Sequence, residues 1–252
     1  MTGEPKIIAG NWKMHKTLVE GQSFLDEFLP LIGGCGEGDA AIILAPNFTL
    51  LSAFASRCQD VGIGLAAQNC HTETAGAFTG ETSVGMLTAI GVTHVLVGHS
   101  ERRALFAEDD ALLHRKVQTV MEAGLVPIFC VGETLAERQE QQHQAVVERQ
   151  LQCGLAGLAG HRLLVAYEPV WAIGTGKTAT VGDAQEMHSF IRRVLDSCFE
   201  GSGRIPILYG GSVKPDNAAQ LMSQPDVDGV LVGGASLVAA DFARIVAAAG
   251  AR

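Results

Sequence analysis

The chain has 252 residues, of which 47% are hydrophobic and 18% charged, and its formal net charge is −9. This composition is typical of a folded protein with a large core and excludes a disordered chain. The negative charge disfavours nucleic acid and anionic membrane surfaces as partners.

Eight short runs of strand-like composition alternate with longer segments of helical period along the chain. Several of these runs are almost entirely apolar, which is typical of parallel strands buried on both faces. The expected strands, in chain order, span 6–10, 41–45, 63–67, 93–97, 126–130, 163–167, 205–209 and 229–232.

The segments between the expected strands have the features of helices. The segment 109–123 begins with Asp109, a typical N-cap, repeats apolar side chains on one face and stops before Gly124. A similar segment spans 183–198. Pro215 is expected to start another helix, because the first turn of a helix tolerates a missing N–H.

The strict alternation of strand and helix predicts right-handed crossovers and one parallel sheet. Eight such units without a long linker favour a single α/β domain, residues 1–252, in which eight parallel strands close into a (β/α)₈ barrel surrounded by helices. A doubly wound open sheet is the alternative fold.

Neither a membrane anchor nor a disulfide framework is expected. No apolar run approaches the roughly 20 residues that span a bilayer, and the first residues, MTGEPKIIAGNWK, lack the pattern of a signal peptide. The six cysteines, at positions 35, 58, 70, 130, 153 and 198, form no C-x-x-C pair and no zinc-like spacing with histidine. We therefore expect reduced thiols, no metal, no membrane partner and a cytoplasmic location.

Polar residues that do not suit a buried strand gather just after the expected strands end. In a (β/α)₈ barrel these positions open onto one rim, where the active sites of this fold lie. We therefore predict a site at this rim. The residues are Asn11, Lys13, Gln68, Asn69, His99, Glu133, Glu168, Ser212, Gly233 and Gly234.

Each candidate also has a structural explanation. Lys13 could be a solvated surface charge, and His99 could be a hydrogen-bonded core histidine. Glu168 is more typical of a functional carboxylate, since carboxylates are rarely buried without a partner. For Glu101 an ion pair with the neighbouring arginines is the stronger interpretation, and for Cys130 a packed thiol without a nucleophilic role.

Glycine-rich stretches point to an anion site and away from a nucleotide site. The run GTGKT at 174–178 resembles the end of a Walker A loop, but Trp171 stands where that motif needs a glycine. Glycine pairs at 210–211 and 233–234 follow the seventh and eighth strands, with Ser212 and Ser236 close to the next helices. Backbone N–H groups at such places bind phosphate without a basic patch.

From end to end the chain resembles the triosephosphate isomerase family, which has the TIM barrel fold. The stretches AYEPVWAIGTGKTAT at 166–180 and VGHSERR at 97–103 are the most specific. The other matching stretches are GNWKMHK (10–16), AGAFTGE (75–81), CVGET (130–134), YGGSV (209–213) and VGGASL (232–237).

The resemblance implies an isomerase of glycolysis and gluconeogenesis that interconverts dihydroxyacetone phosphate and glyceraldehyde 3-phosphate without metal or organic cofactor. By this resemblance Glu168 is the catalytic base, Lys13 and a neutral His99 are the electrophiles, and Asn11 holds Lys13 and the substrate. The implied phosphate ligands are the main-chain groups of Gly174, Ser212, Gly233 and Gly234.

The resemblance also implies a homodimer. The loop from Ala75 to Glu81 carries Phe78, which is awkward on a monomer surface. In the resembled family this loop inserts into a second subunit, where Thr79 supports the lysine and asparagine of the active site.

A lid and two rival functions complete the expectations. The segment 169–180 is expected to close over the substrate, with stiff ends around a tip of small residues. The rivals are a Schiff-base aldolase that uses Lys13 or Lys177, and a non-catalytic phosphosugar-binding protein on the same barrel.

Overall fold

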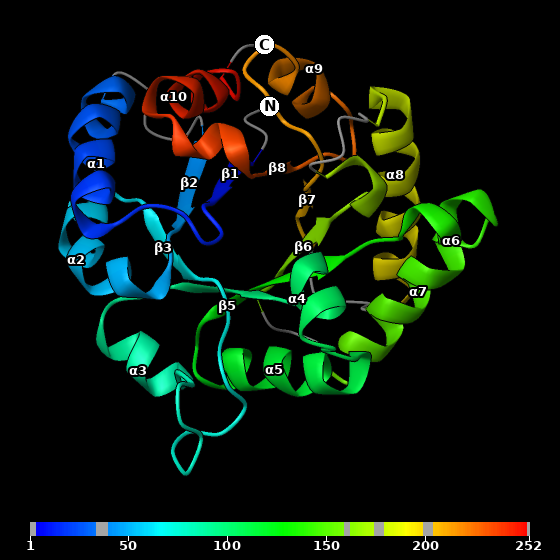
Figure 1. Ribbon diagram of the computed structural model, residues 1–252. Coiled ribbons are helices and arrows are strands. Elements are labelled where there is room, and N and C mark those ends of the chain that lie inside the picture. The colour runs from blue at the N-terminus through cyan, green and yellow to red at the C-terminus, as the bar shows by residue number, and fades with distance from the viewer. Residues whose placement is uncertain (1–3, 34–39, 159–161, 174–178, 199–203, 251–252) are drawn as a thin grey trace.

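The structure, a computed structural model, describes residues 4–33, 40–158, 162–173, 179–198 and 204–250. Within these residues eight parallel strands pair in sequence order, and β8 pairs with β1 to close the barrel (Figure 1). The predicted barrel is therefore confirmed and the open sheet is wrong. The strands are β1 (Lys6–Asn11), β2 (Ala40–Ala45), β3 (Gly64–Ala67), β4 (His94–Val97), β5 (Val126–Val131), β6 (Leu164–Tyr167), β7 (Ile207–Tyr209) and β8 (Gly229–Val232).

Each strand lies within two residues of its predicted bounds, and the largest difference is at the start of β7. The prediction began this strand at Ile205. Pro206 has no N–H to donate to a neighbouring strand, so regular pairing begins only at Ile207. The carbonyl of Pro206 still accepts a hydrogen bond from the N–H of Val165 at 3.0 Å.

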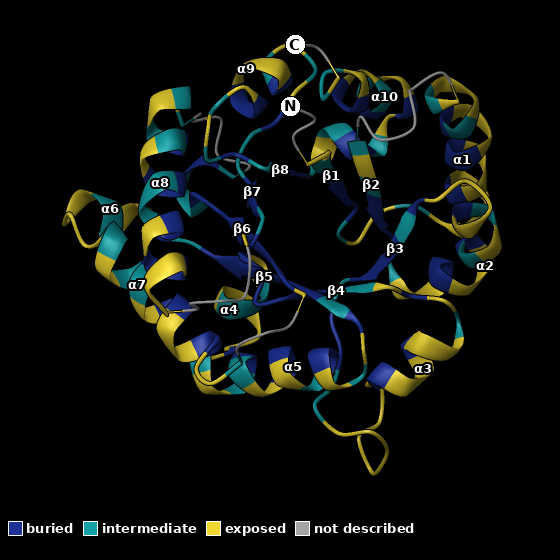
Figure 2. Ribbon diagram, turned by 180° about the vertical axis from the view of Figure 1, so that it is seen from behind, coloured by how far each residue is buried: buried dark blue, intermediate teal, exposed yellow. Residues whose placement is uncertain are grey.

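Apolar side chains pack on both faces of the barrel wall, as expected for parallel strands. A large layer of buried residues lies between the strands and the surrounding helices, whose outer faces are exposed (Figure 2). The barrel interior is filled by smaller side chains, so it is a packed core. The interior residues include Ala9, Ile43, Ala66, Leu96, Ile128, Cys130, Ala166, Leu208 and Leu231.

Helices surround the strands in chain order and run back from the carboxyl end of each strand to the start of the next (Figure 1). The connection after β4 holds two helices, and so does the connection after β5. The helices are α1 (Leu18–Ile32), α2 (Phe48–Gln59), α3 (Val84–Ala89), α4 (Ser100–Leu105), α5 (Asp110–Glu122), α6 (Leu135–Gln139), α7 (His143–Gly154), α8 (Val181–Cys198), α9 (Ala218–Met222) and α10 (Ala239–Ala247), with 3₁₀ turns η1 (Val170–Ala172) and η2 (Gly234–Leu237).

The helix signals were partly confirmed. Asp109 caps α5 by accepting the N–H of Leu112 at 2.8 Å, and Gly124 ends this helix with a positive φ of 73°. By contrast, α8 begins before Asp183, which closes a reciprocal cap with Thr180.

The expectation that Pro215 starts a helix is wrong. Pro215 lies in a turn, and α9 begins at Ala218 after Asn217. The side chain of Asn217 accepts the N–H of Lys214 and donates to the carbonyl of Ser212, and the Lys214 carbonyl accepts the N–H groups of Asn217 and Ala218. No helix in the described ranges is long and apolar enough to cross a membrane.

Candidate active site

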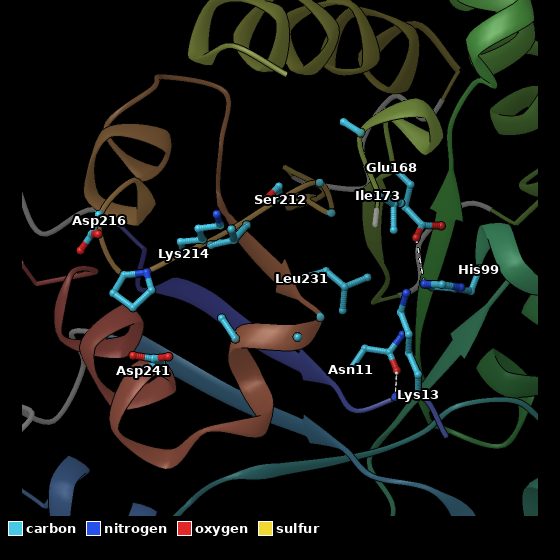
Figure 3. Close-up of a pocket in the computed structure, with 18 of the residues that line it drawn as sticks. Asn11, Lys13, His99, Glu168, Ile173, Ser212, Lys214, Asp216, Leu231 and Asp241 are labelled. Carbon is cyan, nitrogen blue, oxygen red and sulfur yellow. Dashed lines mark hydrogen bonds and ion pairs between the residues drawn. The ribbon is translucent and has the colours of Figure 1, made fainter. Parts of the chain in front are cut away.

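A cavity of about 590 Å³ opens at the carboxyl ends of the strands. Lys13, His99 and Glu168 lie together on one side of it, and Ser212 lies across from them (Figure 3). Gly174 falls outside the described residues. The cavity brings together seven of the predicted site residues: Asn11, Lys13, His99, Glu168, Ser212, Gly233 and Gly234.

Glu168 directly follows β6, and its side chain is buried. Its carboxylate accepts the N–H of Ser100 at 2.9 Å and the Ser100 hydroxyl at 3.3 Å, and it contacts Nε2 of His99 at 2.9 Å. Burial raises the pKa of this carboxyl, but His99 and the Ser100 N–H lower the pKa by more, so it stays below its usual value. An ionised carboxylate is therefore held at the edge of the cavity.

His99 reaches the cavity because the chain turns sharply after β4, at Gly98, which has a φ of 77°. His99 is the N-cap of α4, and its Nδ1 accepts the N–H of Glu101 at 3.3 Å. An accepting Nδ1 carries no proton, so this contact places the ring proton on Nε2, which donates to Glu168.

The pKa of His99 responds to two opposing effects. Burial lowers the pKa of the ring, and the adjacent carboxylate of Glu168 raises it by more, so the net direction is upward. The hydrogen bond at Nδ1 nevertheless favours the neutral ring, since a second proton would point at the N–H of Glu101. The upward shift of the pKa depends on Glu168 beside the ring, whereas the hydrogen bond at Nδ1 belongs to the start of α4 and keeps that nitrogen unprotonated.

Lys13 has an unusual backbone, with a φ of 51° in a residue other than glycine. Two contacts hold the backbone of Lys13 and a third holds the end of its side chain. The N–H of Lys13 donates to the side chain of Asn11 at 3.0 Å, and Gln68 donates to the Lys13 carbonyl at 2.8 Å. The ammonium group pairs with Glu101 at 2.7 Å. Lys13 is therefore a positioned cation rather than a free surface charge.

The partner of Glu101 corrects the sequence interpretation. Glu101 was expected to pair with its neighbours Arg102 and Arg103, but it pairs with Lys13, which lies 88 residues away. The two arginines find other acceptors: Arg102 binds Glu108 at 2.8 Å and Arg103 binds Asp110 at 2.7 Å. Successive residues of a helix point in different directions, so adjacent charges need not meet.

The other end of the cavity is built from backbone. Gly234 faces open space, since a Cβ added there would meet no atom within 4 Å, and a Cβ at Gly233 would lie 3.9 Å from Cε of Lys13. η2 starts at Gly234, and its first residues, Gly234 and Ala235, line the cavity, where the N–H groups at the start of a helical turn lack partners within the turn. Gly211 must lack a side chain, because its Cβ would lie 2.2 Å from the Tyr209 hydroxyl. Donors without bulk, at the start of a helical turn, are suited to an oxyanion such as phosphate.

The model of the triosephosphate isomerase family matches residues 6–249. The chain is 52% identical to a triosephosphate isomerase of Syntrophotalea carbinolica over 245 residues, which cover 95% of this chain and 96% of the relative. The enzyme of Geobacter metallireducens is 51% identical over 95% of this chain and 97% of the relative. That of Symbiobacterium thermophilum is 49% identical, with 96% of each chain covered. The chain belongs to the triosephosphate isomerase family.

Three residues predicted for the rim lie outside the cavity of this triosephosphate isomerase barrel and bond to other side chains or to the backbone. Gln68 holds the Lys13 carbonyl. Asn69 accepts the buried ammonium group of Lys116 at 2.7 Å. Glu133 is fully buried, and its carboxylate accepts the indole N–H of Trp171 at 2.8 Å. Burial raises the pKa of Glu133, and the bonds from Trp171 and Tyr167 oppose this effect.

Some residues that line the cavity or contact its lining residues were missed by the sequence analysis. Ser100 holds Glu168, and its only sequence signal was its place in the run GHSERR. Lys214 and Arg244 line the outer part of the cavity. Nothing in their local sequence distinguished them from ordinary surface cations.

Cys130 packs inside the barrel, as its structural interpretation predicted. It is fully buried, and burial raises the pKa of its thiol far above the usual value. In the described part of the chain no group of three or more histidine, cysteine or acidic side chains has a geometry that could hold a metal ion.

Proposed function

We propose that the chain interconverts dihydroxyacetone phosphate and glyceraldehyde 3-phosphate, the reaction of its family in glycolysis and gluconeogenesis, and that Glu168, His99, Lys13 and Asn11 carry the chemistry. One observation supports this division of roles above all. An ionised carboxylate, an imidazole N–H and a fixed ammonium group converge at one end of a cavity whose other end offers glycine N–H groups.

Glu168 is proposed as the base that moves a proton between the two adjacent carbons of the substrate. A single carboxylate can take the proton from one carbon and return it to the next, since both lie within its reach. In the structure the carboxylate is engaged by Ser100 and His99. Catalysis therefore requires the side chain to leave these donors and turn into the cavity.

His99 and Lys13 are proposed to stabilise the enediolate. The neutral ring donates from Nε2, which becomes available to a substrate oxygen when Glu168 turns away. The ammonium group of Lys13 provides positive charge where the second oxygen gains negative charge. Asn11 holds the N–H of Lys13 and lines the same cavity, so it is suited to orient both the lysine and the substrate.

The phosphate group is proposed to lie at the glycine end of the cavity. Ser212, Gly233 and Gly234 supply N–H groups there, and Gly174 would add another from the lid. This arrangement explains how a chain with a formal net charge of −9 binds an anionic substrate, because recognition depends on local donors.

An assay of the purified protein tests the proposal. Conversion of glyceraldehyde 3-phosphate is followed by a coupled dehydrogenase, with borohydride trapping of dihydroxyacetone phosphate in parallel. The isomerase turns over and forms no adduct. A covalent adduct on Lys13 or Lys177 would indicate the aldolase, and binding of substrate without turnover would indicate a phosphosugar-binding protein.

We also propose that the barrel is one domain that works as a cytoplasmic homodimer. Two observations support the dimer. Met14, the residue after Lys13, is 94% exposed, and Phe78 is 43% exposed on the loop 75–81. This loop projects beyond the ring of helices (Figure 1), where Phe78 contacts only His71 among aromatic rings of the described chain, at 4.2 Å. Such side chains are stabilised when a second subunit covers them.

A further inference from the structure

The end of β5 lacks a strand neighbour on one side. β4 pairs with β5 only as far as Val97, opposite Phe129, and then turns away at Gly98 to bring His99 to the cavity. In a strand the N–H and C=O groups of alternate residues face opposite neighbours. Cys130 and Gly132 therefore present backbone groups to the side that β4 has left.

On its other side the same segment holds the catalytic base and the start of the lid. The carbonyl of Val131 accepts the N–H of Glu168 at 2.8 Å, and the carbonyl of Glu133 accepts the N–H of Val170 at 3.1 Å. Gly132 lies between them and touches Glu168 directly. A Cβ on Gly132 would lie 1.8 Å from the Glu168 carbonyl oxygen. The position of residues 131–133 therefore sets the position of the Glu168 backbone.

A buried side chain from α7 occupies the place of the missing strand. Oε1 of Gln150 accepts the N–H of Gly132 at 2.8 Å, and Nε2 donates to the Gly132 carbonyl at 3.1 Å. Only one orientation of the amide can satisfy both groups, so the assignment is unambiguous. On the same side of the strand, the guanidinium group of Arg103 donates a hydrogen bond to the Cys130 carbonyl at 3.2 Å.

We propose that Gln150 is a positioning residue for the isomerase reaction. By holding the Gly132 peptide, Gln150 fixes the position of the Glu168 backbone relative to the cavity. The inference rests on the proposed role of Glu168 as the base. Gln150 is only 5% exposed and lies behind the cavity wall, so it does not contact substrate. Its effect passes through Gly132 to the backbone of Glu168.

The space around Gln150 suggests that loss of its amide would disturb the position of Glu168 without unfolding the barrel. A second cavity, of about 410 Å³, is lined by Gln150, Gly132, Ser100, Glu168 and Val170. Water in this space can bind the Gly132 peptide if the amide is removed, so the barrel should survive the change. The fixed distance between α7 and the base would be lost.

The test compares two glutamines of the same helix. Gln150→Met keeps the length of the side chain and removes both hydrogen bonds, whereas Gln152→Met changes an exposed glutamine whose side chain bonds to Glu148 on the same helix. We expect kcat of Gln150→Met to fall about tenfold, since small displacements of a catalytic group cost up to about a hundredfold in rate. KM should change less than about twofold, because Gln150 does not line the cavity that is proposed to bind the phosphate.

Gln150→Glu supplies an independent readout. When its carboxyl is protonated it can accept from the Gly132 N–H and donate to the Gly132 carbonyl, as the amide does. When it is ionised it faces that carbonyl without a donor. The kcat of Gln150→Glu relative to the wild type should therefore rise severalfold as pH falls. If Gln150→Met does not fold, this ratio decides the question alone.

The outcomes are distinguishable. A kcat of Gln150→Met equal to that of Gln152→Met, or a pH-independent ratio for Gln150→Glu, overturns the positioning role. Equal losses in both methionine variants would show a general effect on α7 and would also overturn it. A wild-type protein without isomerase activity would instead contradict the proposed function.

Discussion

Glu168 is the proposed catalytic base, and in the structure its carboxylate is bonded to Ser100 and His99 and does not yet face a substrate. Its carboxylate is buried yet has the N–H and hydroxyl of Ser100 and the ring of His99 as donors. Hydrogen bonds to a charged group contribute about 1.5–3 kcal/mol each. The move toward substrate therefore needs new interactions of comparable strength, which the enediolate site provides.

Replacement of Glu168 by glutamine tests its role as the base. Glu168→Gln keeps the shape and the contact with His99 but cannot accept the substrate proton, so kcat should fall about 10²–10⁴-fold. Inhibition by inorganic phosphate should persist, because Gly233 and Gly234 are untouched. Steady-state kinetics and phosphate inhibition measure both, with the exposed Glu140→Gln as control. A variant that keeps a tenth of the wild-type kcat would remove Glu168 from the mechanism.

A second residue-scale prediction concerns stability in acid. His188 is fully buried between Tyr167 and Tyr209, and its Nδ1 donates to the carbonyl of Asp226 at 3.1 Å. Burial lowers the pKa of His188 to about 4. The unfolded chain, with a histidine pKa near 6.5, binds a proton that the folded chain does not. This contribution to stability is complete above pH 6.5 and is lost as pH falls toward 4.

His188→Gln should therefore make stability less dependent on pH. Glutamine can still donate to Asp226 but does not titrate. Between pH 7 and pH 5 the free energy of unfolding should drop about 2 kcal/mol less in the variant than in the wild type. Urea unfolding at both pH values measures the difference, with the exposed His15→Gln as control. Parallel pH dependence in the variant and the wild type would contradict the assignment.

At the scale of elements, the strands were the most predictable feature because burial on both faces leaves a continuous apolar signal. Helix starts were predictable where a side chain caps the first turn, as at Asp109, and not at Pro215, where Asn217 bonds to Lys214 and Ser212 and the helix begins later. A polar residue after a strand was a useful but incomplete signal for the cavity: it located Asn11, His99 and Glu168, whereas Gln68 and Glu133 lie outside the cavity. Contacts such as Lys13 with Glu101 or Gln150 with Gly132 were not, because packing alone brings these partners together.

The segment 169–180, which is expected to act as a lid, is a further feature at the scale of elements. Its first part is anchored: Val170 bonds to the Glu133 carbonyl, and the indole of Trp171 bonds to the Glu133 carboxylate. Its far end is fixed by the reciprocal cap of Thr180 and Asp183. Residues 174–178, with Gly174 and Lys177, lie outside the described chain. Two fixed ends suit a segment that closes as a unit, as the sequence predicts.

Deletion of residues 173–176 should slow isomerisation and change the products. An enediolate phosphate exposed to water can expel phosphate before it is reprotonated, so the intermediate needs a closed site. The deletion variant should release more methylglyoxal and inorganic phosphate per turnover than the wild type. Product analysis by chromatography measures both. A slow variant without extra methylglyoxal would show that the segment positions Glu168 without protecting the intermediate.

At the scale of the whole molecule, assembly should control activity. The loop that carries Lys13 and Met14 is tied to the strand ends near the projecting loop 75–81, since Gln68 after β3 binds the Lys13 carbonyl. A subunit that covers Met14 and Phe78 would therefore also steady Lys13, the proposed electrophile. Loss of the dimer should lower kcat even though no catalytic residue is changed.

Phe78→Asp tests this coupling. Burial of an unpaired carboxylate is unfavourable, so the variant should be monomeric and should lose most of its activity. Val61→Asp, which changes an exposed apolar residue in the turn before β3, should remain dimeric and active. Light scattering and kinetics at the same protein concentration measure both properties. A fully active monomer of the wild type at nanomolar concentration would contradict the proposal.

The pairing of β8 with β1 has one more consequence. Ile7 to Gly10 lie in register with Gly229 to Val232, and α10 runs back along the barrel, so both ends of the described chain lie near β1 and β8 (Figure 1). Apart from the missing covalent link, this seam is like the other seven. The eight strand–helix units therefore form a closed ring, in which the first and last units are neighbours like any other pair. A gene that joined the two ends by a short linker and began elsewhere, for example at the exposed turn around Gln141, would encode the same barrel.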